Sequence, residues 1–268
     1  MRVVEVLNRT GKVVVLPTSD GYAMSNNNDS TCASMIHRRR GGAAQRAGCS
    51  GFITTLALMA ALSGCGDSFN GDGSTKINGS IHVPAGKQPG AVATVNGSIE
   101  VDDNAAVTSA KTVNGSVHIG DHATATSLAS VNGAITLGAG AHVSGSVSSV
   151  NGELTLREGA EDAGALSNVN GKITLSGAHV SGGIKTINGS MSITGASRVE
   201  GGILVKKPSG VVVETSSDVP RIVIGPGAAV QGELRFERTV QLYVSDKATI
   251  GTVTGATPIP FTGDTPPN

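Results

Sequence analysis

The chain has 268 residues and a formal net charge of zero, with 20 Lys and Arg against 20 Asp and Glu. This balance gives no electrostatic support for nucleic-acid binding, which depends on clustered positive charge. With 38 Gly, no Trp, 2 Tyr and 4 Phe, the composition also excludes a core built on aromatic side chains, so Val, Ile, Leu and Ala must supply the buried area.

The first 34 residues are mixed and polar, ending in SNNNDSTCAS, and precede an internal methionine, Met35. Export signals begin close to the N-terminus with a basic segment, and the basic segment of this chain (MIHRRRGGAAQR) begins at Met35. We therefore predict that translation starts at Met35 and that residues 1–34 are a disordered upstream extension. The alternative is a genuine N-terminal extension.

Residues 35–64 have the organisation of a signal peptide. The basic segment is followed by an apolar run, GFITTLALMAALSG, which is shorter than the roughly 20 residues of a membrane span. This order predicts a signal helix that is cleaved on export. The alternative is a buried helix that carries a cysteine by chance.

The end of this segment, Leu62-Ser63-Gly64-Cys65, resembles a bacterial lipobox. The resemblance implies that Cys65 is lipidated and becomes the first residue of the mature chain, followed by a linker over residues 65–74. Gly66 stands where an aspartate would resemble an inner-membrane retention signal, so we expect attachment to the outer membrane, facing the periplasm. Cleavage would also remove Cys32 and Cys49, which leaves no cysteine for a metal or redox site.

From residue 75 to 205 the sequence repeats. Asn-Gly recurs at intervals of 18 or 19 residues, and a shorter period of six runs inside it, as in Val101, Val107, Val113 and Ile119. Alternate residues of a strand share a face, so each hexad is a short strand plus a corner. The sequence thus predicts an all-β, single-stranded, three-sided parallel β-helix with about 18 residues per coil. The alternative is an antiparallel meander, because Asn-Gly is also a hairpin signal.

The Asn-Gly pairs are expected to form one corner of each coil. Glycine adopts positive φ there at little cost, and side-chain amides in register bond from coil to coil. We place the extra residue of the two 19-residue intervals near Ser148–Ser149 and near Glu161–Ala163. The corner asparagines are Asn78, Asn96, Asn114, Asn132, Asn151, Asn170 and Asn188.

Two lysines, Lys111 and Lys185, interrupt the inward pattern three residues before an Asn. Either each lysine stem lies at a coil edge with its head in water, or the inward register fails on that side of the coil.

The repeat pattern breaks at residues 206–220, which we interpret as a loop leaving the solenoid. Alternation resumes over residues 221–262, where the aromatic residues Phe236, Tyr243 and Phe261 are found. This segment is expected to form the terminal coils and a cap that protects the last edge, with residues 263–268 as a tail. The whole solenoid would then have about ten coils.

The coil length and the run VIGPGAAVQGEL resemble the bactofilins, a family of polymer-forming bacterial proteins with triangular parallel β-helices. The unit TVNGSIEV is similar to the β-solenoid domains of bacterial envelope proteins described as adhesin-like. The lipobox, the Asn-Gly coils and the closing GATPIPF are similar to uncharacterised proteobacterial lipoproteins. These resemblances cover residues 65–262 and imply a solenoid scaffold in the cell envelope.

Few residues suggest chemistry. His82 and His118 lie two coils apart, too far to share a metal ion. His118, His122 and Asp121 flank one corner but are expected to be solvated, as are the carboxylate pairs at Asp102 and Asp103 and at Glu161 and Asp162. We therefore predict no catalytic residue, no cofactor and no metal site.

These observations lead to a hypothesis of a non-enzymatic, lipid-anchored structural or interaction module of the cell envelope. Its expected partners are the membrane, through lipid on Cys65, and a second copy of the chain or another envelope protein. The alternatives are an adhesin-like or sensory accessory protein and, more remotely, a hexapeptide-type acyltransferase, for which His142 and His179 are the candidate catalytic residues.

Overall fold

The computed structural model describes residues 2–7, 13–18, 73–208 and 219–267, which fall into two separate units. In the first unit, β1 (Arg2–Leu7) pairs antiparallel with β2 (Val13–Thr18). The valine-rich runs of these two strands favour extended backbone and pairing. That residues 1–34 are an upstream extension stays a prediction. The predicted signal segment and Cys65 lie outside the described residues.

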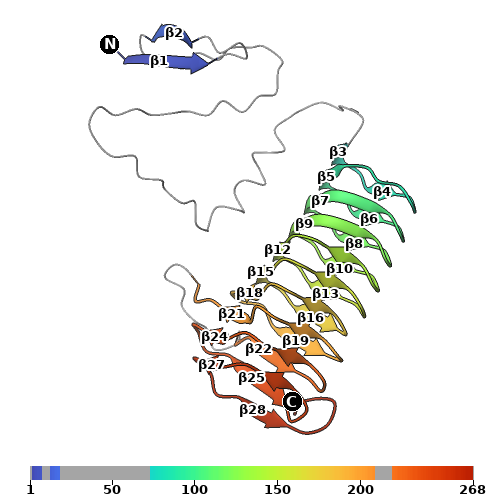
Figure 1. Cartoon of the computed structure of the whole chain (residues 1–268), viewed down its shortest axis with the longest axis vertical. Coiled ribbons are helices and arrows are strands. Elements are labelled where there is room, and N and C mark those ends of the chain that lie inside the picture. The colour runs from blue at the N-terminus through green and yellow to red at the C-terminus, as the bar shows by residue number, and fades with distance from the viewer. Residues whose placement is uncertain (1, 8–12, 19–72, 209–218, 268) are drawn as a thin grey trace. The chain divides into compact units, whose positions relative to one another are not determined.

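The second unit is a parallel β-solenoid of ten coils, which confirms the fold class (Figure 1). One ten-stranded sheet contributes a strand to every coil and forms what we call the first face. Its strands are β4 (Ile81–Val83), β6 (Ile99–Val101), β8 (Val117–Ile119), β10 (Ile135–Leu137), β13 (Leu154–Leu156), β16 (Ile173–Ser176), β19 (Met191–Thr194), β22 (Arg221–Ile224), β25 (Gln241–Ser245) and β28 (Ile259–Phe261).

A sixteen-stranded sheet forms the other two faces. The second face contains β11 (His142–Val143), β14 (Glu161–Asp162), β17 (His179–Val180), β20 (Arg198–Val199), β23 (Ala229–Val230) and β26 (Thr249–Ile250). The third face contains β3 (Gly73–Asn78), β5 (Ala91–Asn96), β12 (Val147–Asn151), β15 (Leu166–Asn170), β18 (Ile184–Thr186), β21 (Ile203–Val205), β24 (Leu234–Phe236) and β27 (Val253–Thr254). Two longer strands, β7 (Ala106–Asn114) and β9 (Thr124–Asn132), run through both faces.

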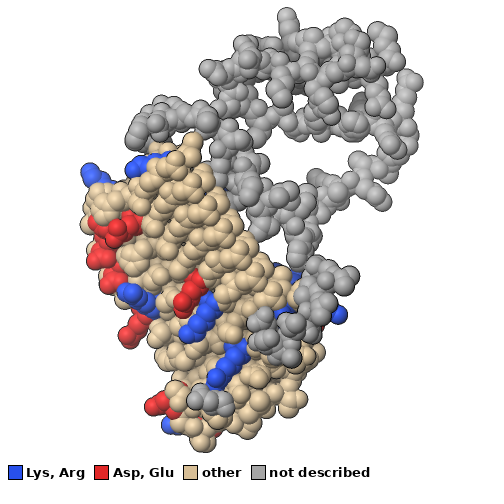
Figure 2. All heavy atoms as spheres, turned by 180° about the vertical axis from the view of Figure 1, so that it is seen from behind, with Lys and Arg blue, Asp and Glu red and all other residues tan. Residues whose placement is uncertain are grey.

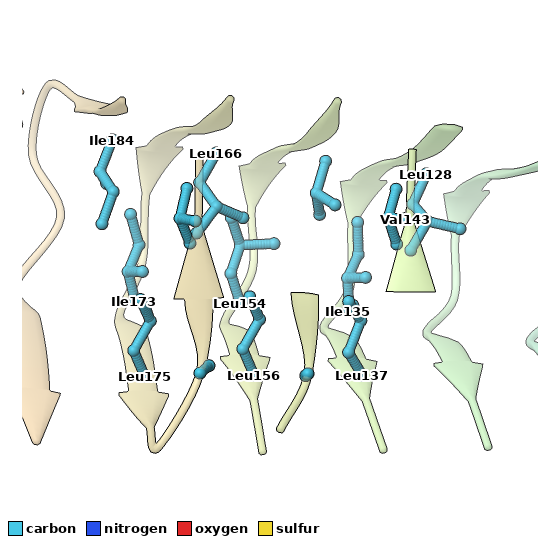
Figure 3. Packing of buried hydrophobic residues seen from close by; sticks show 14 of the residues in the cluster. Leu128, Ile135, Leu137, Val143, Leu154, Leu156, Leu166, Ile173, Leu175 and Ile184 are labelled. Carbon is cyan, nitrogen blue, oxygen red and sulfur yellow. The ribbon is translucent and has the colours of Figure 1, made fainter. Parts of the chain in front are cut away.

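The core consists of aliphatic columns that run along the solenoid axis (Figure 3). On the first face, Leu154 and Leu156 are fully buried and lie in register with Ile135 and Leu137 of the preceding coil. Thr155, between them, points outward and is partly exposed. A single coil cannot bury its own inner face, so stacking of coils is the folding unit.

On the third face, the residues that point inward are shifted by one position from those that the sequence predicted. We expected Val113 to point inward, but Thr112 is buried there and Val113 is partly exposed. Because side chains alternate, a shift of one residue exchanges the inner and outer sets. Lys111 and Lys185 therefore lie on the outward positions of this face, so the second of the two interpretations of these lysines holds.

Hydrogen bonds explain why hydroxyl groups occupy the inside of this face. The hydroxyl of Thr112 donates to the carbonyl oxygen of Gly97 in the preceding coil at 3.0 Å, and that of Ser130 donates to Gly115 at 3.2 Å. A buried polar group is stable when it is bonded, and here the hydroxyl also satisfies a corner carbonyl. Thr94 bonds Gly79 in the same way.

The Asn-Gly corners carry a continuous amide ladder. The Nδ2 atom of each asparagine donates to the Oδ1 atom of the asparagine one coil before it, at 2.8 to 3.1 Å, from Asn96 to Asn188. The Arg238 guanidinium donates to Oδ1 of Asn188 and to the Ile187 carbonyl. One row of side chains therefore links seven coils and ends on a cation.

At five of the seven Asn-Gly corners the glycine is needed for a different reason from the one expected. Positive φ occurs at Gly79 and Gly171, with values of 106° and 129°, but not at Gly115. A Cβ atom at Gly115 would lie 2.0 Å from the carbonyl oxygen of Gly97. Close approach of the backbones of successive coils therefore excludes a side chain there.

The extra residue of the 19-residue coils lies in the corner between the second and third faces. Ala125 and Leu128 are three positions apart, whereas the residues paired with them in the next coil, Val143 and Val147, are four positions apart. The position expected at Ser148–Ser149 is thus wrong, because those residues lie within β12 and the insertion precedes them. The next coil widens at the same corner, between β14 and β15, where the expected range Glu161–Ala163 overlaps it.

The chain leaves the solenoid between β21 and β22 and returns in register. Met191 pairs with Ile222, a step of 222 − 191 = 31 residues, where a coil needs 18 or 19. Most of the interruption, residues 209–218, lies outside the described residues. The strands before and after it are nevertheless neighbours, so the insertion leaves the stacking of the coils unbroken.

Candidate functional site

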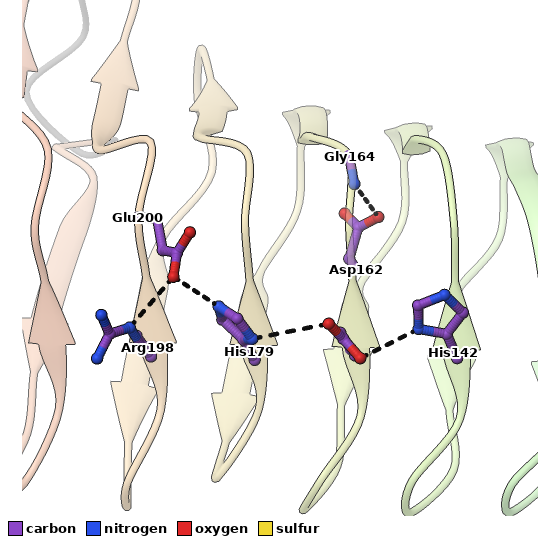
Figure 4. Close-up of polar contacts among 7 residues, drawn as sticks. His142, Asp162, Gly164, His179, Arg198 and Glu200 are labelled. Atoms are coloured by element: carbon purple, nitrogen blue, oxygen red, sulfur yellow. Dashed lines mark hydrogen bonds and ion pairs between the residues drawn. The ribbon is translucent and has the colours of Figure 1, made fainter.

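Ionisable side chains form a row on the outside of the second face (Figure 4). Strand pairing places Glu161 directly between His142 and His179 of the neighbouring coils. Glu161 Oε2 lies 3.2 Å from His142 Nδ1, and Glu161 Oε1 lies 3.9 Å from His179 Nδ1. The two histidines that the sequence singled out therefore share one carboxylate.

The row continues towards the C-terminus. His179 Nε2 lies 3.2 Å from Glu200 Oε1, and the same oxygen accepts a hydrogen bond from Arg198 Nε at 3.3 Å. All five side chains are substantially exposed, at 37 to 50% of their surface. Exposed ion pairs contribute little to stability, so this row is more important for the surface it presents than for the fold.

The surroundings of His142 give little support for an acyltransferase. A hollow of about 310 Å³ lies beside it, between the first coils of the second face. Its lining has one titratable side chain, that of His142, with Thr124, Thr126 and Ser144 nearby. Glu161, the partner of His142, lies on the coil on the other side.

Asp162, beside this row, is buried, which corrects the prediction that it is a solvated corner residue. It occupies an inward position of the second face, in register with Val143 and Val180, and is fully inaccessible. Its Oδ1 accepts a hydrogen bond from the Gly164 backbone N–H at 3.2 Å, and its Oδ2 has no protein partner. Desolvation raises the pKa of the carboxyl to about 6, against the smaller lowering effects of that hydrogen bond and of His142.

At the corner that contains Asp121 and His122, carboxylate side chains accept hydrogen bonds from backbone N–H groups. Asp121 Oδ1 accepts a hydrogen bond from the Ala139 N–H at 2.7 Å, and Asp103 accepts one from the Asp121 N–H in the same way. His122 has a φ of 57°, the left-handed conformation that the turn requires. The corner is thus built by stacked turns, and its carboxylates act as backbone acceptors.

A different group of ligand-type side chains converges at the N-terminal end of the first face. His82 on β4 faces Glu100 on β6, and Asp102 follows at the next corner. One ligand atom from each lies within 4.8 Å of the other two. The sequence contains a signal for this arrangement, because His82 and Glu100 are one 18-residue coil apart, whereas the two-coil spacing of His82 and His118 does not reveal it.

The third face carries an uncharged outer stripe along the amide ladder, formed by one β-branched residue per coil. Each is exposed at least in part, and Ile77 in the first coil is 51% exposed. Seen from behind, much of the solenoid surface is formed by uncharged residues, with charged side chains gathered in patches (Figure 2). The members of the aliphatic stripe are Ile77, Val95, Val113, Val131, Val150, Val169 and Ile187.

Two findings bear on the wider identity of the chain. Among the residues that the structure describes, no helix has the length and apolar character needed to cross a membrane. Comparison of the chain with protein-family models, with curated proteins and with solved structures found no match.

Proposed function

We propose that this chain is a non-enzymatic, lipid-anchored structural and interaction module of the bacterial cell envelope, and that it self-associates through the free edge of its first coil. The observation that carries the proposal is the difference between the two ends of the solenoid. The lipobox-like sequence Leu62-Ser63-Gly64-Cys65 supports the anchor, and a short segment separates it in the sequence from the first coil, which begins at Gly73.

Among the described residues, the first coil presents a strand edge with free backbone groups. Ile81 N–H donates to the Ser98 carbonyl, and Asp102 N–H donates to the Val83 carbonyl, both at 2.9 Å. Successive residues of a strand bond in opposite directions, so the N–H and C=O of His82 point away from the second coil. Among the described strands, β4 pairs with β6 alone. Such an edge is a template for pairing with another chain.

In the last coil the edge of β28 is protected by proline, although β26 and β27, among the described strands, also pair on one side only. Asp246 N–H donates to the Phe261 carbonyl at 3.1 Å, so Phe261 bonds to the preceding coil and its neighbour Pro260 faces outward. Proline has no N–H to offer to an incoming strand, and Pro258 stands just before β28. Phe261, only 6% exposed, covers the end of the core.

Association through one edge predicts a limited assembly, in which two first coils meet. Sedimentation velocity over a range of concentrations should show a dimer for the wild type. His82→Pro removes the outward N–H and should give a monomer, whereas His82→Gln keeps that N–H and should behave as the wild type. The double replacement Pro258→Ala and Pro260→Ala gives the strand of the last coil backbone N–H groups that can pair with another chain. This variant should form oligomers longer than the dimer.

Two results would sink the self-association proposal: a wild-type protein that stays monomeric at high concentration, or equal association of the proline and glutamine variants. Because His82 is exposed and its N–H is not bonded to the second coil, the proline variant should keep the fold. Circular dichroism of both variants verifies this.

A second candidate function is an adhesin-like or sensory accessory role, and the aliphatic stripe favours it. Seven β-branched residues, one in each of the first seven coils, form a row beside the amide ladder that suits an extended apolar ligand. Aliphatic side chains exposed as a contiguous row are more often interaction sites than isolated ones.

A further inference from the structure

His82, Glu100 and Asp102 bring one imidazole and two carboxylates together from two adjacent coils. His82 Nε2 lies 3.3 Å from Asp102 Oδ2, and His82 Nδ1 lies 3.7 Å from Glu100 Oε2. Ligand atoms held about 2.0–2.2 Å from a tetrahedral zinc ion are roughly 3.3–3.6 Å apart. The separation of His82 and Asp102 already meets this requirement.

The third ligand is close enough to complete the set. One atom of each of the three side chains lies within 4.8 Å of the others, and the Glu100 side chain is 62% exposed and hence able to rotate. Asp102 is the least exposed of the three, at 34%, and its backbone N–H is bonded to the Val83 carbonyl. The Asp102 backbone is thus held by the stacking of the coils, whereas the more exposed side chains of His82 and Glu100 can both adjust.

The charge of this group favours a cation. Both carboxylates have the same imidazole as their ion-pair partner, so a neutral His82 leaves two negative charges side by side. A divalent ion compensates both charges, and zinc accepts both imidazole nitrogen and carboxylate oxygen as ligands. Calcium and magnesium prefer oxygen ligands alone.

The row on the second face shows why the position of Asp102 matters. Glu161 also faces a histidine at 3.2 Å, but its other neighbour, His179, lies two coils from His142. His179 contacts two carboxylates, those of Glu161 and Glu200. Among the described residues, however, only His82, Glu100 and Asp102 each offer a ligand atom within 4.8 Å of the other two. His142 is therefore a matched control, a histidine facing a glutamate without the third ligand.

We propose that His82, Glu100 and Asp102 bind one zinc ion, with water completing the coordination. The ion would link β4 of the first coil to β6 and the corner that follows it, and so fix the outermost strand of the solenoid.

The test is zinc binding to the full chain, measured by equilibrium dialysis and metal analysis. His82→Gln and Asp102→Asn should each bind one zinc equivalent fewer than the wild type, and Glu100→Gln should bind about tenfold more weakly. His142→Gln should match the wild type. The native cysteines are present in every variant, so any zinc that they bind cancels in the comparison.

A second readout does not depend on stoichiometry. Zinc should slow hydrogen exchange at the β4 amides in the wild type and not in Asp102→Asn, whose fold is checked by circular dichroism. The proposal is overturned if all variants bind as much zinc as the wild type, if His142→Gln loses the same equivalent, or if zinc leaves exchange in β4 unchanged.

Discussion

Gly115→Ala is expected to destabilise the solenoid by about 3 kcal/mol or more, at the upper end of the cost of overpacking. The added Cβ would lie 2.0 Å from the Gly97 carbonyl oxygen and 2.5 Å from its carbon. Both are backbone atoms, which cannot rotate away as a side chain could. Separating the coils to make room would strain the Gly97 N–H bond to the Asn114 carbonyl, now 3.0 Å long. Urea unfolding monitored by circular dichroism measures the loss.

Gly79→Ala is the matched control for this prediction, because Gly79 occupies the same corner in the first coil. A Cβ there meets nothing within 4 Å, and its φ of 106° is the one source of strain, worth roughly 1–2 kcal/mol. If Gly115→Ala cost no more than Gly79→Ala, close approach of the coils would not be the reason for glycine at this corner.

Asp162→Asn should stabilise the protein at pH 8 and leave it nearly unchanged at pH 3. Burial raises the pKa of Asp162 from 3.8 to about 6, so both the folded and the unfolded state bind the proton at pH 3. As the pH rises through 4 to 6, the unfolded state ionises first and the wild type loses stability. Above pH 6 the loss is complete, about 3 kcal/mol for a shift of about two pH units.

The difference in unfolding free energy between Asp162→Asn and the wild type depends on pH through Asp162 alone, since all other ionisable groups are common to both. Asparagine keeps an oxygen to accept the Gly164 N–H bond. Asp162→Val, which continues the column of Val143 and Val180, should also stabilise at pH 8. A constant difference between Asn and wild type from pH 3 to pH 8 would contradict an ionisable, buried Asp162.

Most of the fold could be predicted from spacing. The Asn-Gly interval defined the coil, and the hexads identified the inward residues of the first and second faces, such as Val117 and Ile119. The third face could not be assigned by hydrophobicity, since that criterion prefers Val113 inside to Thr112. The hydrogen bond from Thr112 to Gly97 reverses the preference, and it becomes visible only when coils are stacked.

The candidate sites show the same limit. The sequence singled out His142 and His179 but not Glu161 as their common partner, because the extra residue of the 19-residue coils shifts the register between them. It placed Asp162 in a corner, since a buried aspartate has no hydrophobic signal. His82, Glu100 and Asp102 could have been found by adding one coil length to His82 and examining the neighbouring positions.

The orientation of the third face is central to this account, because the Thr and Ser column, the close approach of the glycines and the aliphatic stripe all follow from it. Thiol accessibility tests it most directly. Single cysteines are introduced at Thr112 and at Val113 in a chain whose Cys32, Cys49 and Cys65 are replaced by serine, and their reaction with a thiol reagent is timed in the folded protein. The account predicts rapid reaction at position 113 and protection at position 112; rapid reaction at 112 with protection at 113 would contradict it.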